Sequence, residues 1–279
     1  MKKVVIIISV ALFFSIETMA QNEIDALRYS MISFGGTARY SSMGGAFGAL
    51  GADFSTISTN PAGLAVYRKN EFTFTPSIYK SGTKAIYNGK SAEEDKYNFN
   101  FGNMGMVFNL KTNSNNDEKG WKTVNIAFGL NRNNNFHKKV LIEGNNYQSS
   151  LMDLYLDAAQ GKVYEDLDPF STQLAFNTYL LDTISATNYF SNVPSGGLLQ
   201  RKLIETKGAM QEMVFALGAN YNNKLYIGGT IGFPYIKYSE YSSYEEQDEK
   251  DSLLIFNRFI INEDMVTSGS GFNFKFGIM

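Results

Sequence analysis

Residues 213–221 read Met-Val-Phe-Ala-Leu-Gly-Ala-Asn-Tyr, and large apolar side chains alternate there with small ones. Successive side chains of a β-strand point to opposite faces, so Phe215 and Leu217 share one face while Ala216 and Gly218 share the other. The alternation predicts a strand of about ten residues, which is long for a globular protein and typical of a tilted membrane crossing.

The same alternation recurs from Glu71 to the end of the sequence. Five further runs show it: 72–78, 97–110, 123–130, 225–233 and 272–278. The sequence therefore predicts an all-β, antiparallel protein with six strands, or seven if residues 252–262 form one of their own. Two architectures agree with this periodicity. The apolar face is the core in a soluble β-sandwich, whereas it meets lipid in an outer-membrane β-barrel.

Two features favour the barrel. Aromatic residues stand at the ends of the runs, where the interfacial girdle of a barrel lies: Trp121, Tyr221, Tyr235 and Tyr238. The connections also alternate in length. Those at 111–120 and 221–224 are short, whereas those at 81–96, 133–208 and 240–251 are long. We therefore expect residues 71–279 to form a partial transmembrane β-barrel, with a long outer loop at 133–208 that holds two helical stretches, near 151–158 and 174–184.

The first twenty residues have the organisation of a secretory signal peptide. Lys2 and Lys3 precede an apolar run at 4–14, and Thr18-Met19-Ala20 offers small residues at the positions that signal peptidase reads. A membrane anchor is the alternative, but the run is shorter than the ~20 residues that span a bilayer. We expect cleavage near Ala20 and export to the outer membrane of a Gram-negative cell.

Composition removes several classes of function. Charged residues make up 19% of the chain and the net charge is −2, so a nucleic-acid partner is not expected. Cysteine is absent and His137 is the single histidine, which argues against thiolate or multi-histidine metal sites and His-based acid–base catalysis. We expect no enzyme activity, no metal and no cofactor.

Residues 21–70 lack the two-residue period. An amphipathic helix is expected at 22–33, with Ile24, Leu27 and Met31 on one side, and a glycine-dense stretch follows at 42–53. Pro61 forces the preceding Asn60 into an extended conformation, which is typical of a turn. We expect this segment to be a compact, irregular plug.

The run at 97–110 changes its parity. Apolar residues are odd-numbered up to Phe101 and even-numbered from Met104, so a bulge or kink is predicted at Gly102 and Asn103, close to Gly105. Two interpretations remain open. The bulge is either a local twist or an interruption of the barrel wall.

Three stretches resemble a known family: SSMGGAFGALGADFSTISTNPAGLAVY at 41–67, DPFSTQLAFNTYL at 168–180 and GSGFNFKFG at 269–277. The chain is similar to FadL/TodX-type outer-membrane transporters of hydrophobic compounds, and most of all to their Bacteroidetes branch, often labelled hemin receptors. The resemblance implies a fourteen-stranded barrel with an N-terminal hatch folded inside it. Asn60, Pro61 and Ala62 match the Asn-Pro-Ala motif of the hatch. Family members open the wall at a kinked strand, and Gly102, Asn103 and Gly105 are the candidates for that kink.

The strand count matches only the N-terminal half of that family, so we expect a truncated fragment. The expected function is transport of hydrophobic molecules such as long-chain fatty acids or aromatic hydrocarbons. The alternatives are a surface binding or adhesion protein, or a heme receptor, that uses the barrel as an anchor. The expected partners are a hydrophobic small-molecule ligand, outer-membrane lipid and lipopolysaccharide, and the barrel-assembly machinery. The full-length protein is expected to be a monomer.

Overall fold

The computed structural model describes residues 23–33, 35–112, 119–248 and 256–279. The predicted signal peptide at 1–20, with its cleavage site at Ala20, lies outside the described residues. The part of the chain that is described is mostly β and its main sheet is antiparallel. None of its helices has both the length and the apolar character needed to cross a membrane.

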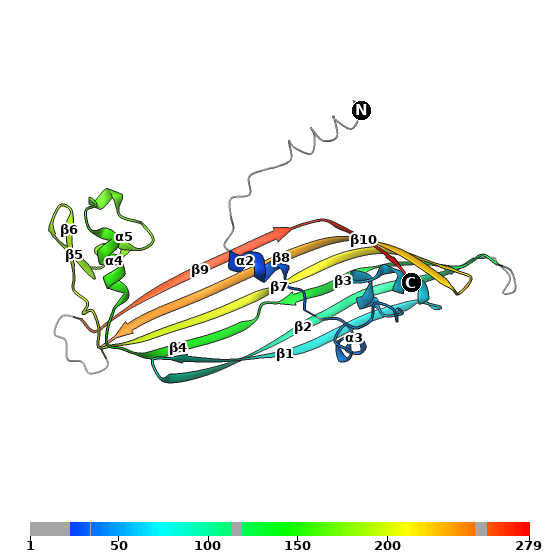
Figure 1. Ribbon diagram of the computed structural model, residues 1–279, viewed down its shortest axis with the longest axis horizontal. Coiled ribbons are helices and arrows are strands. Elements are labelled where there is room, and N and C mark those ends of the chain that lie inside the picture. The colour runs from blue at the N-terminus through cyan, green and yellow to red at the C-terminus, as the bar shows by residue number, and fades with distance from the viewer. Residues whose placement is uncertain (1–22, 34, 113–118, 249–255) are drawn as a thin grey trace, which may run out of the picture.

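One long, twisted sheet dominates the structure (Figure 1). The path across it crosses six strands, in agreement with the six predicted runs: β1 (Glu71–Tyr87), β2 (Lys90–Lys111), β3 (Trp121–Asn135), β7 (Leu198–Tyr221), β8 (Leu225–Gln247) and β10 (Asn273–Ile278). β4 (Lys138–Asn146) also pairs with β7, and β9 (Arg258–Ser270) pairs with β8 in the same register as β10. We call this sheet the wall.

Two of the three connections that the sequence predicted to be long loops are largely strand, and the third is strand at its ends. β1 and β2 form one hairpin through 81–96, closed by Asn88 and Gly89 in left-handed conformations, and β8 extends to Gln247. β4 and the first part of β7 occupy the ends of the predicted loop 133–208, which shrinks to 147–197. β4 and the first part of β7 pair apolar residues such as Val140 and Ile204, whereas the added parts of β1, β2 and β8 are mostly polar and carry no apolar face. They pair instead through contacts such as Lys84–Glu93, 2.7 Å across the hairpin.

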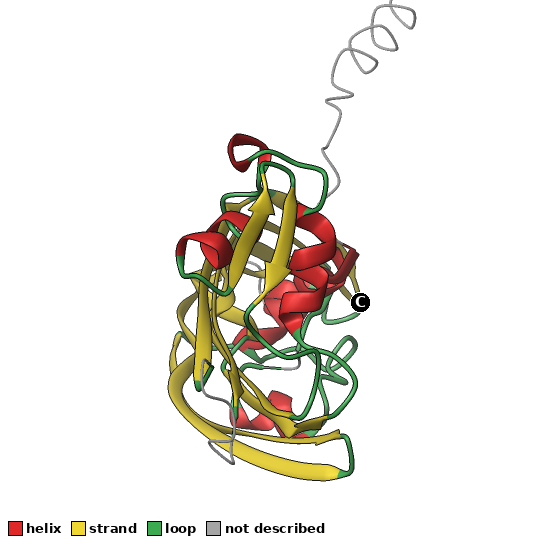
Figure 2. Cartoon of the chain, turned by 90° about the vertical axis from the view of Figure 1, so that its left-hand side faces the viewer, coloured by secondary structure: helices red, strands yellow, loops and turns green. Residues whose placement is uncertain are grey.

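Residues 147–197, which we call the cap, form a small unit at one end of the wall (Figures 1 and 2), and their hydrophobic core includes Phe256 and Phe259 from the segment of β9. The cap holds α4 (Leu151–Ala159), η3 (Tyr164–Asp166), α5 (Thr172–Asn177), β5 (Leu181–Ser185) and β6 (Asn188–Ser191). The first predicted helical stretch is confirmed, and Ser150 and Asp153 form a capping box at its start. The second was predicted too long, because the chain after α5 turns into the short hairpin β5–β6.

Residues 23–70, which we call the plug, contain no strand among the described positions. Their helices are α2 (Glu23–Ser30), α3 (Ala38–Ser42), η1 (Phe54–Ser58) and η2 (Pro61–Val66). η1 and η2 pack on the wall, where Phe54, Ile57 and Leu64 form a buried cluster with side chains of β2, β3 and β7. The apolar face predicted for α2 is not buried. The helix contacts the wall through Tyr29 instead, which packs edge-on against Phe136 and Tyr238.

The two faces of the wall have opposite polarity. The inner face, which contacts the plug, buries Asn103, Asn125, Asn131, Glu212 and Thr230. The outer face exposes large apolar side chains on every strand of the path, including Phe72, Phe74, Phe99, Met104, Phe128, Phe215, Leu217, Ile231, Phe274 and Phe276. The inner face also buries small apolar side chains such as Val107 and Val214 against the plug. Buried polar groups and large exposed apolar patches, both of them exceptions in water-soluble proteins, thus occur together on this sheet.

Candidate functional site

Asn60, Pro61 and Ala62, the predicted hatch motif, begin η2. The Asn60 Oδ1 accepts a hydrogen bond from the Ala62 amide at 3.0 Å, and its Nδ2 donates to the Gly48 carbonyl at 2.7 Å. Pro61 occupies the first turn, where its missing N–H costs nothing. The motif therefore ties two stretches of the plug together, and its hydrogen bonds stay within the plug.

Five glycines on the inner face of the wall receive the plug: Gly105, Gly129, Gly218, Gly228 and Gly277. We call them the glycine track. A β-carbon on any of them would lie between 1.9 and 2.8 Å from the nearest plug atom. Gly105 and Gly129 are paired across β2 and β3, and the ring of Phe54 covers both. The absence of side chains thus lets the plug backbone and one aromatic ring approach the strands closely.

Gly105, one of the candidates for the kink, lies in a part of β2 that is paired on both sides. β2 is paired with β1 on one side of Gly105 and with β3 on the other. The volume that a side chain at Gly105 would occupy is filled by Phe54. Gly105 therefore belongs to the contact between plug and wall.

Polar side chains of the wall complete that contact. Three buried asparagines of the wall donate their side-chain amides to the plug: Asn103 to Ser55 Oγ at 3.1 Å, Asn125 to the Leu64 carbonyl at 2.7 Å, and Asn131 to Ser58 Oγ at 2.9 Å. The sequence analysis singled out Asn103 only for its place at the parity switch. The other two stand among apolar residues on strands, which is the signal that identifies them.

Glu212 is the one charged residue on β7 that contacts the plug, and the sequence analysis missed it. Its side chain is 1% exposed and accepts hydrogen bonds from Ser58 at 2.8 Å and from Asn273 at 2.6 Å. The ammonium group of Lys275 on β10 balances its charge. Glu212 therefore joins the plug to two strands of the wall.

The parity switch at Gly102 is a β-bulge, as predicted. Thr75 pairs with Asn103 and Pro76 with Phe101, so Gly102 is the extra residue. The ladder between β2 and β3 ends at the next position, where Asn103 pairs with Asn131. Beyond that point no ladder joins the two strands, although the Asn135 side-chain amide still donates to the Asn98 Oδ1 at 3.4 Å.

A side chain of β3 and the backbone of the plug bridge the place where the ladder between β2 and β3 ends. The Nε of Arg132 donates to the Phe101 carbonyl at 3.1 Å, and the Ser33 amide of the plug donates to the Asn133 carbonyl at 2.7 Å. A β-carbon on Gly102 would lie 2.8 Å from the Gly36 carbonyl oxygen. The interrupted ladder is thus covered by residues 33–36, with residue 34 outside the described part.

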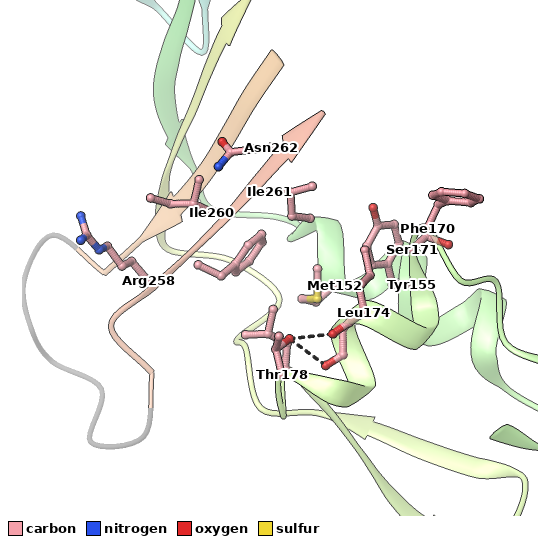
Figure 3. Close-up of a pocket in the computed structure, with 13 residues that line it drawn as sticks. Met152, Tyr155, Phe170, Ser171, Leu174, Thr178, Arg258, Ile260, Ile261 and Asn262 are labelled. Carbon is pink, nitrogen blue, oxygen red and sulfur yellow. Dashed lines mark hydrogen bonds between the residues drawn. The ribbon is translucent and has the colours of Figure 1, made fainter. Parts of the chain in front are cut away.

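A cavity of about 430 Å³ lies between the cap and β9 (Figure 3). Its apolar lining comes from Met152, Leu174, Leu180, Phe259 and Ile261, and its polar groups include Tyr155, Ser171 and Thr178. Phe170 stands at its rim with 85% of its surface exposed. The volume and the mostly apolar lining match those of small-molecule sites.

The polar groups of this cavity are largely engaged. The Ser171 hydroxyl donates to Asp168 at 3.0 Å, and the Thr178 hydroxyl donates to the Leu174 carbonyl at 2.8 Å. Arg258 lies on the far side of β9 from Tyr155 (Figure 3) and pairs with Glu245 at 3.6 Å. Burial raises the pKa of Tyr155, and the carboxylates of Glu263 and Asp168 raise it further.

A second cavity, of about 460 Å³, contains His137. The His137 Nδ1 lies 2.8 Å from the Asn135 Oδ1, and burial together with Lys96 and Arg132 lowers the imidazole pKa. Tyr238 also lines this cavity, donates its hydroxyl to Glu240 and lies under the Arg28 guanidinium, 4.1 Å from the ring centre. The two side chains of this cavity that could ligate heme iron, His137 and Tyr238, are thus engaged with neighbours. No group of three His, Cys, Asp or Glu residues that could hold a metal occurs in the described ranges.

No family model, no curated protein and no solved structure matches this chain.

Proposed function

We propose that the chain is part of an outer-membrane β-barrel that transports hydrophobic small molecules past an N-terminal plug. The observation that carries the proposal is the reversed polarity of the wall, with apolar side chains outside and polar, plug-bound side chains inside. In water such an outer face would be an aggregation hazard, whereas in a bilayer it is the surface that lipid requires.

The height of the apolar band supports insertion. On β7 the band extends from Met213 to Tyr221, and charged residues replace it on the same face at Lys207 and Glu205. A strand of about ten residues, rising ~3.3 Å each and tilted by ~40°, spans ~25 Å, which is the height of a barrel's apolar band. Trp121 and Tyr221 pack edge-on at one border, with ring centres 5.3 Å apart.

A route for ligand follows from the arrangement of the sites. The cavity under the cap would capture an apolar molecule, and the plug would have to shift before the molecule could leave where the ladder between β2 and β3 ends. The contacts that resist this shift are those of Glu212, the three wall asparagines and Phe54. Transport requires no covalent chemistry, and the protein supplies binding and gating only.

A reversible lock of the plug tests the proposal. The Ser58 Oγ and Asn131 Nδ2 lie 2.9 Å apart, and the chain has no cysteine of its own, so a Ser58→Cys/Asn131→Cys pair introduces one defined disulfide. Uptake of a fluorescent apolar probe by outer-membrane vesicles that contain the protein should fall to background when the pair is oxidised and return on reduction. The two single-cysteine variants are the controls. Unchanged uptake with a fully oxidised pair contradicts a plug-gated route.

The surface-binding alternative rests on the cap. Phe170, Tyr179 and Ile184 are exposed there, at 85%, 76% and 73% of their surfaces. A protein that only binds a partner through the cap would bind it equally well with the plug locked and would take up no probe in either state. The same lock therefore separates the two functions.

A further inference from the structure

We infer that the outer face of the wall binds a lipopolysaccharide molecule, with one phosphate group between Lys207 and Lys237 and an acyl chain in a hollow of the apolar band. The inference rests on the proposed function, since it requires the band to lie in an outer membrane. It assigns a ligand that is held on the outside of the wall and is not transported.

Lys207 and Lys237 are neighbours on the outer face, just beyond the apolar band, which ends on β8 at Phe233. Lys237 of β8 pairs with Ala209 of β7, so Lys207, on the same face of β7, is its diagonal neighbour. Diagonal neighbours stand ~7–8 Å apart, which leaves room for one phosphate between the two ammonium groups. Both lysines are exposed, and Lys237 has no ion-pair partner among the described residues. Two like charges at this spacing repel each other, and an anion between them removes the repulsion.

Hydroxyl groups flank the lysine pair on the same face. Ser268 of β9 lies opposite Lys237, and Ser239 of β8 lies opposite Lys207. A serine hydroxyl can donate a hydrogen bond to a phosphate oxygen or accept one from a sugar hydroxyl. Three adjacent strands thus present two cations and two hydroxyls to one place on the outer face.

Acidic side chains do not neutralise the pair. The described outer-face positions of β7, β8 and β9 between the row of Tyr235 and the row of Lys207 carry no acid. Glu205 is the next outer-face residue of β7 and lies 3.2 Å from Lys207, but it also pairs with Lys96. The patch therefore keeps a net positive charge, which favours an anionic ligand.

A hollow in the apolar band lies further along β7. It has a volume of about 270 Å³, and its lining includes Met104 and Met106 of β2 and Met213 and Phe215 of β7. Lys207 and Met213 share the outer face of β7, so one strand joins the charged patch to the hollow. Methionine side chains adapt to irregular apolar shapes, which suits a flexible acyl chain. Charge at the border and a hollow within the band together match a lipid that carries a phosphate headgroup.

The position of the pair identifies the leaflet. Barrels of the outer membrane have short periplasmic turns and longer extracellular loops. The short connections 111–120 and 221–224 stand at the border of the band marked by Trp121 and Tyr221, whereas the lysine pair stands at the opposite border, towards the cap (Figure 1). The pair therefore faces the outer leaflet, where the phosphorylated lipid of a Gram-negative cell is lipopolysaccharide.

Native mass spectrometry of the purified protein in detergent measures the binding, with diphosphoryl lipid A as the probe. Phosphatidylglycerol is the comparison, because its phosphate diester carries one negative charge, whereas a phosphate monoester carries up to two. We expect lipid A to bind about tenfold more tightly or better. Equal affinities would overturn the assignment to lipopolysaccharide.

Two double variants locate the phosphate. Lys207→Gln combined with Lys237→Gln should weaken lipid A binding by about tenfold or more, because both positive charges beside the phosphate are lost. Lys84→Gln combined with Lys90→Gln is the matched control. It removes the same charge from exposed residues of the β1–β2 hairpin that pair with Glu93 and Glu143, and it should change the affinity by less than about twofold. Equal effects of the two double variants overturn the inference.

Leu130→Trp tests the hollow, which Leu130 also lines. The larger side chain fills the hollow and should weaken the binding of lipid A while both lysines stay in place. Unchanged affinity in this variant overturns the placement of the acyl chain. These results are separate from transport, because the plug lock measures uptake. A protein whose lock abolishes uptake and whose lysine variants keep full affinity for lipid A retains the proposed function and loses this inference.

Discussion

Glu212 is the residue whose removal should weaken the contact between plug and wall most. Its carboxylate is buried and depends on Lys275, Asn273 and Ser58. Glu212→Ala leaves the ammonium of Lys275 without its partner, and breaking a buried pair costs about 3 kcal/mol or more. We expect this loss in the free energy of unfolding, measured by urea titration of the protein in detergent.

Lys207 provides the control on the same strand, because its side chain is exposed and Glu205, 3.2 Å away, also pairs with Lys96. Lys207→Ala should change the free energy of unfolding by less than about 0.5 kcal/mol, because exposed ion pairs contribute little. Equal effects of the two substitutions would mean that Glu212 does not hold the plug.

Gly105 tests the contact between the glycine track and Phe54. A β-carbon at Gly105 would lie 2.2 Å from the Phe54 ring, so Gly105→Ala should cost about 1–3 kcal/mol of stability. Gly229→Ala is the matched control, since its β-carbon would meet only ordinary contacts, at 3.8 Å. Adding Phe54→Leu should recover part of the loss at Gly105 in a double-mutant cycle. Additive effects would contradict the direct contact.

His137 makes stability depend on pH. Its pKa in the folded protein is lowered from 6.5 by burial and by Lys96 and Arg132, so the unfolded chain takes up the proton first. The destabilisation of the folded protein by proton uptake in the unfolded chain is absent well above pH 6.5 and grows as the pH falls through that value. Urea midpoints should therefore decrease from pH 7.5 to pH 5.5, and His137→Asn should reduce the decrease. An identical pH profile for the variant would contradict this role.

At the scale of elements, β2 shows what the sequence could predict. The change of parity at Gly102 located the bulge correctly, because one extra residue must reverse the faces of a strand. The strand ends were less predictable, since β1, β2 and β8 continue as polar ribbons in which neither face is apolar. Glu212 was missed for a related reason. A lone acid in a strand has no local signature, and its partners on η1 and β10 are distant in sequence.

Deletion of Gly102 tests the bulge directly. Because Gly102 is the extra residue opposite β1, its deletion leaves a regular ladder and keeps Phe99 on the outer face. We therefore expect the folded, heat-modifiable band on gel electrophoresis to persist after refolding in detergent. Deletion of Met106, which is paired on both sides without a bulge, would instead turn Gly105 outward and Met104 towards the plug, and should abolish the band. Loss of the band without Gly102, or a folded band without Met106, would contradict this assignment of the bulge.

At the scale of the whole molecule, six of the eight strands of the wall and a plug without strands were predicted, because alternation and its absence are local properties. The assembly of the plug on the wall was not predicted in detail. It depends on glycines of five strands that come together only in the folded chain. The apolar outer face could be predicted from local pattern alone. The alternation that marks each strand produces a continuous apolar band once the strands are paired.

The central claim is that this band faces lipid, and spin labelling measures it most directly. Because the chain has no cysteine, single cysteines can be labelled at Met213, Phe215 and Leu217 on the outer face and at Val214 and Ala216 on the inner face. In membranes, the outer labels should be accessible to oxygen and protected from a water-soluble nickel relaxant, and the inner labels should be protected from both. Lys80→Cys, on the outer face beyond the band, should be accessible to nickel. Nickel accessibility at 213, 215 and 217 would contradict membrane insertion and the function proposed from it.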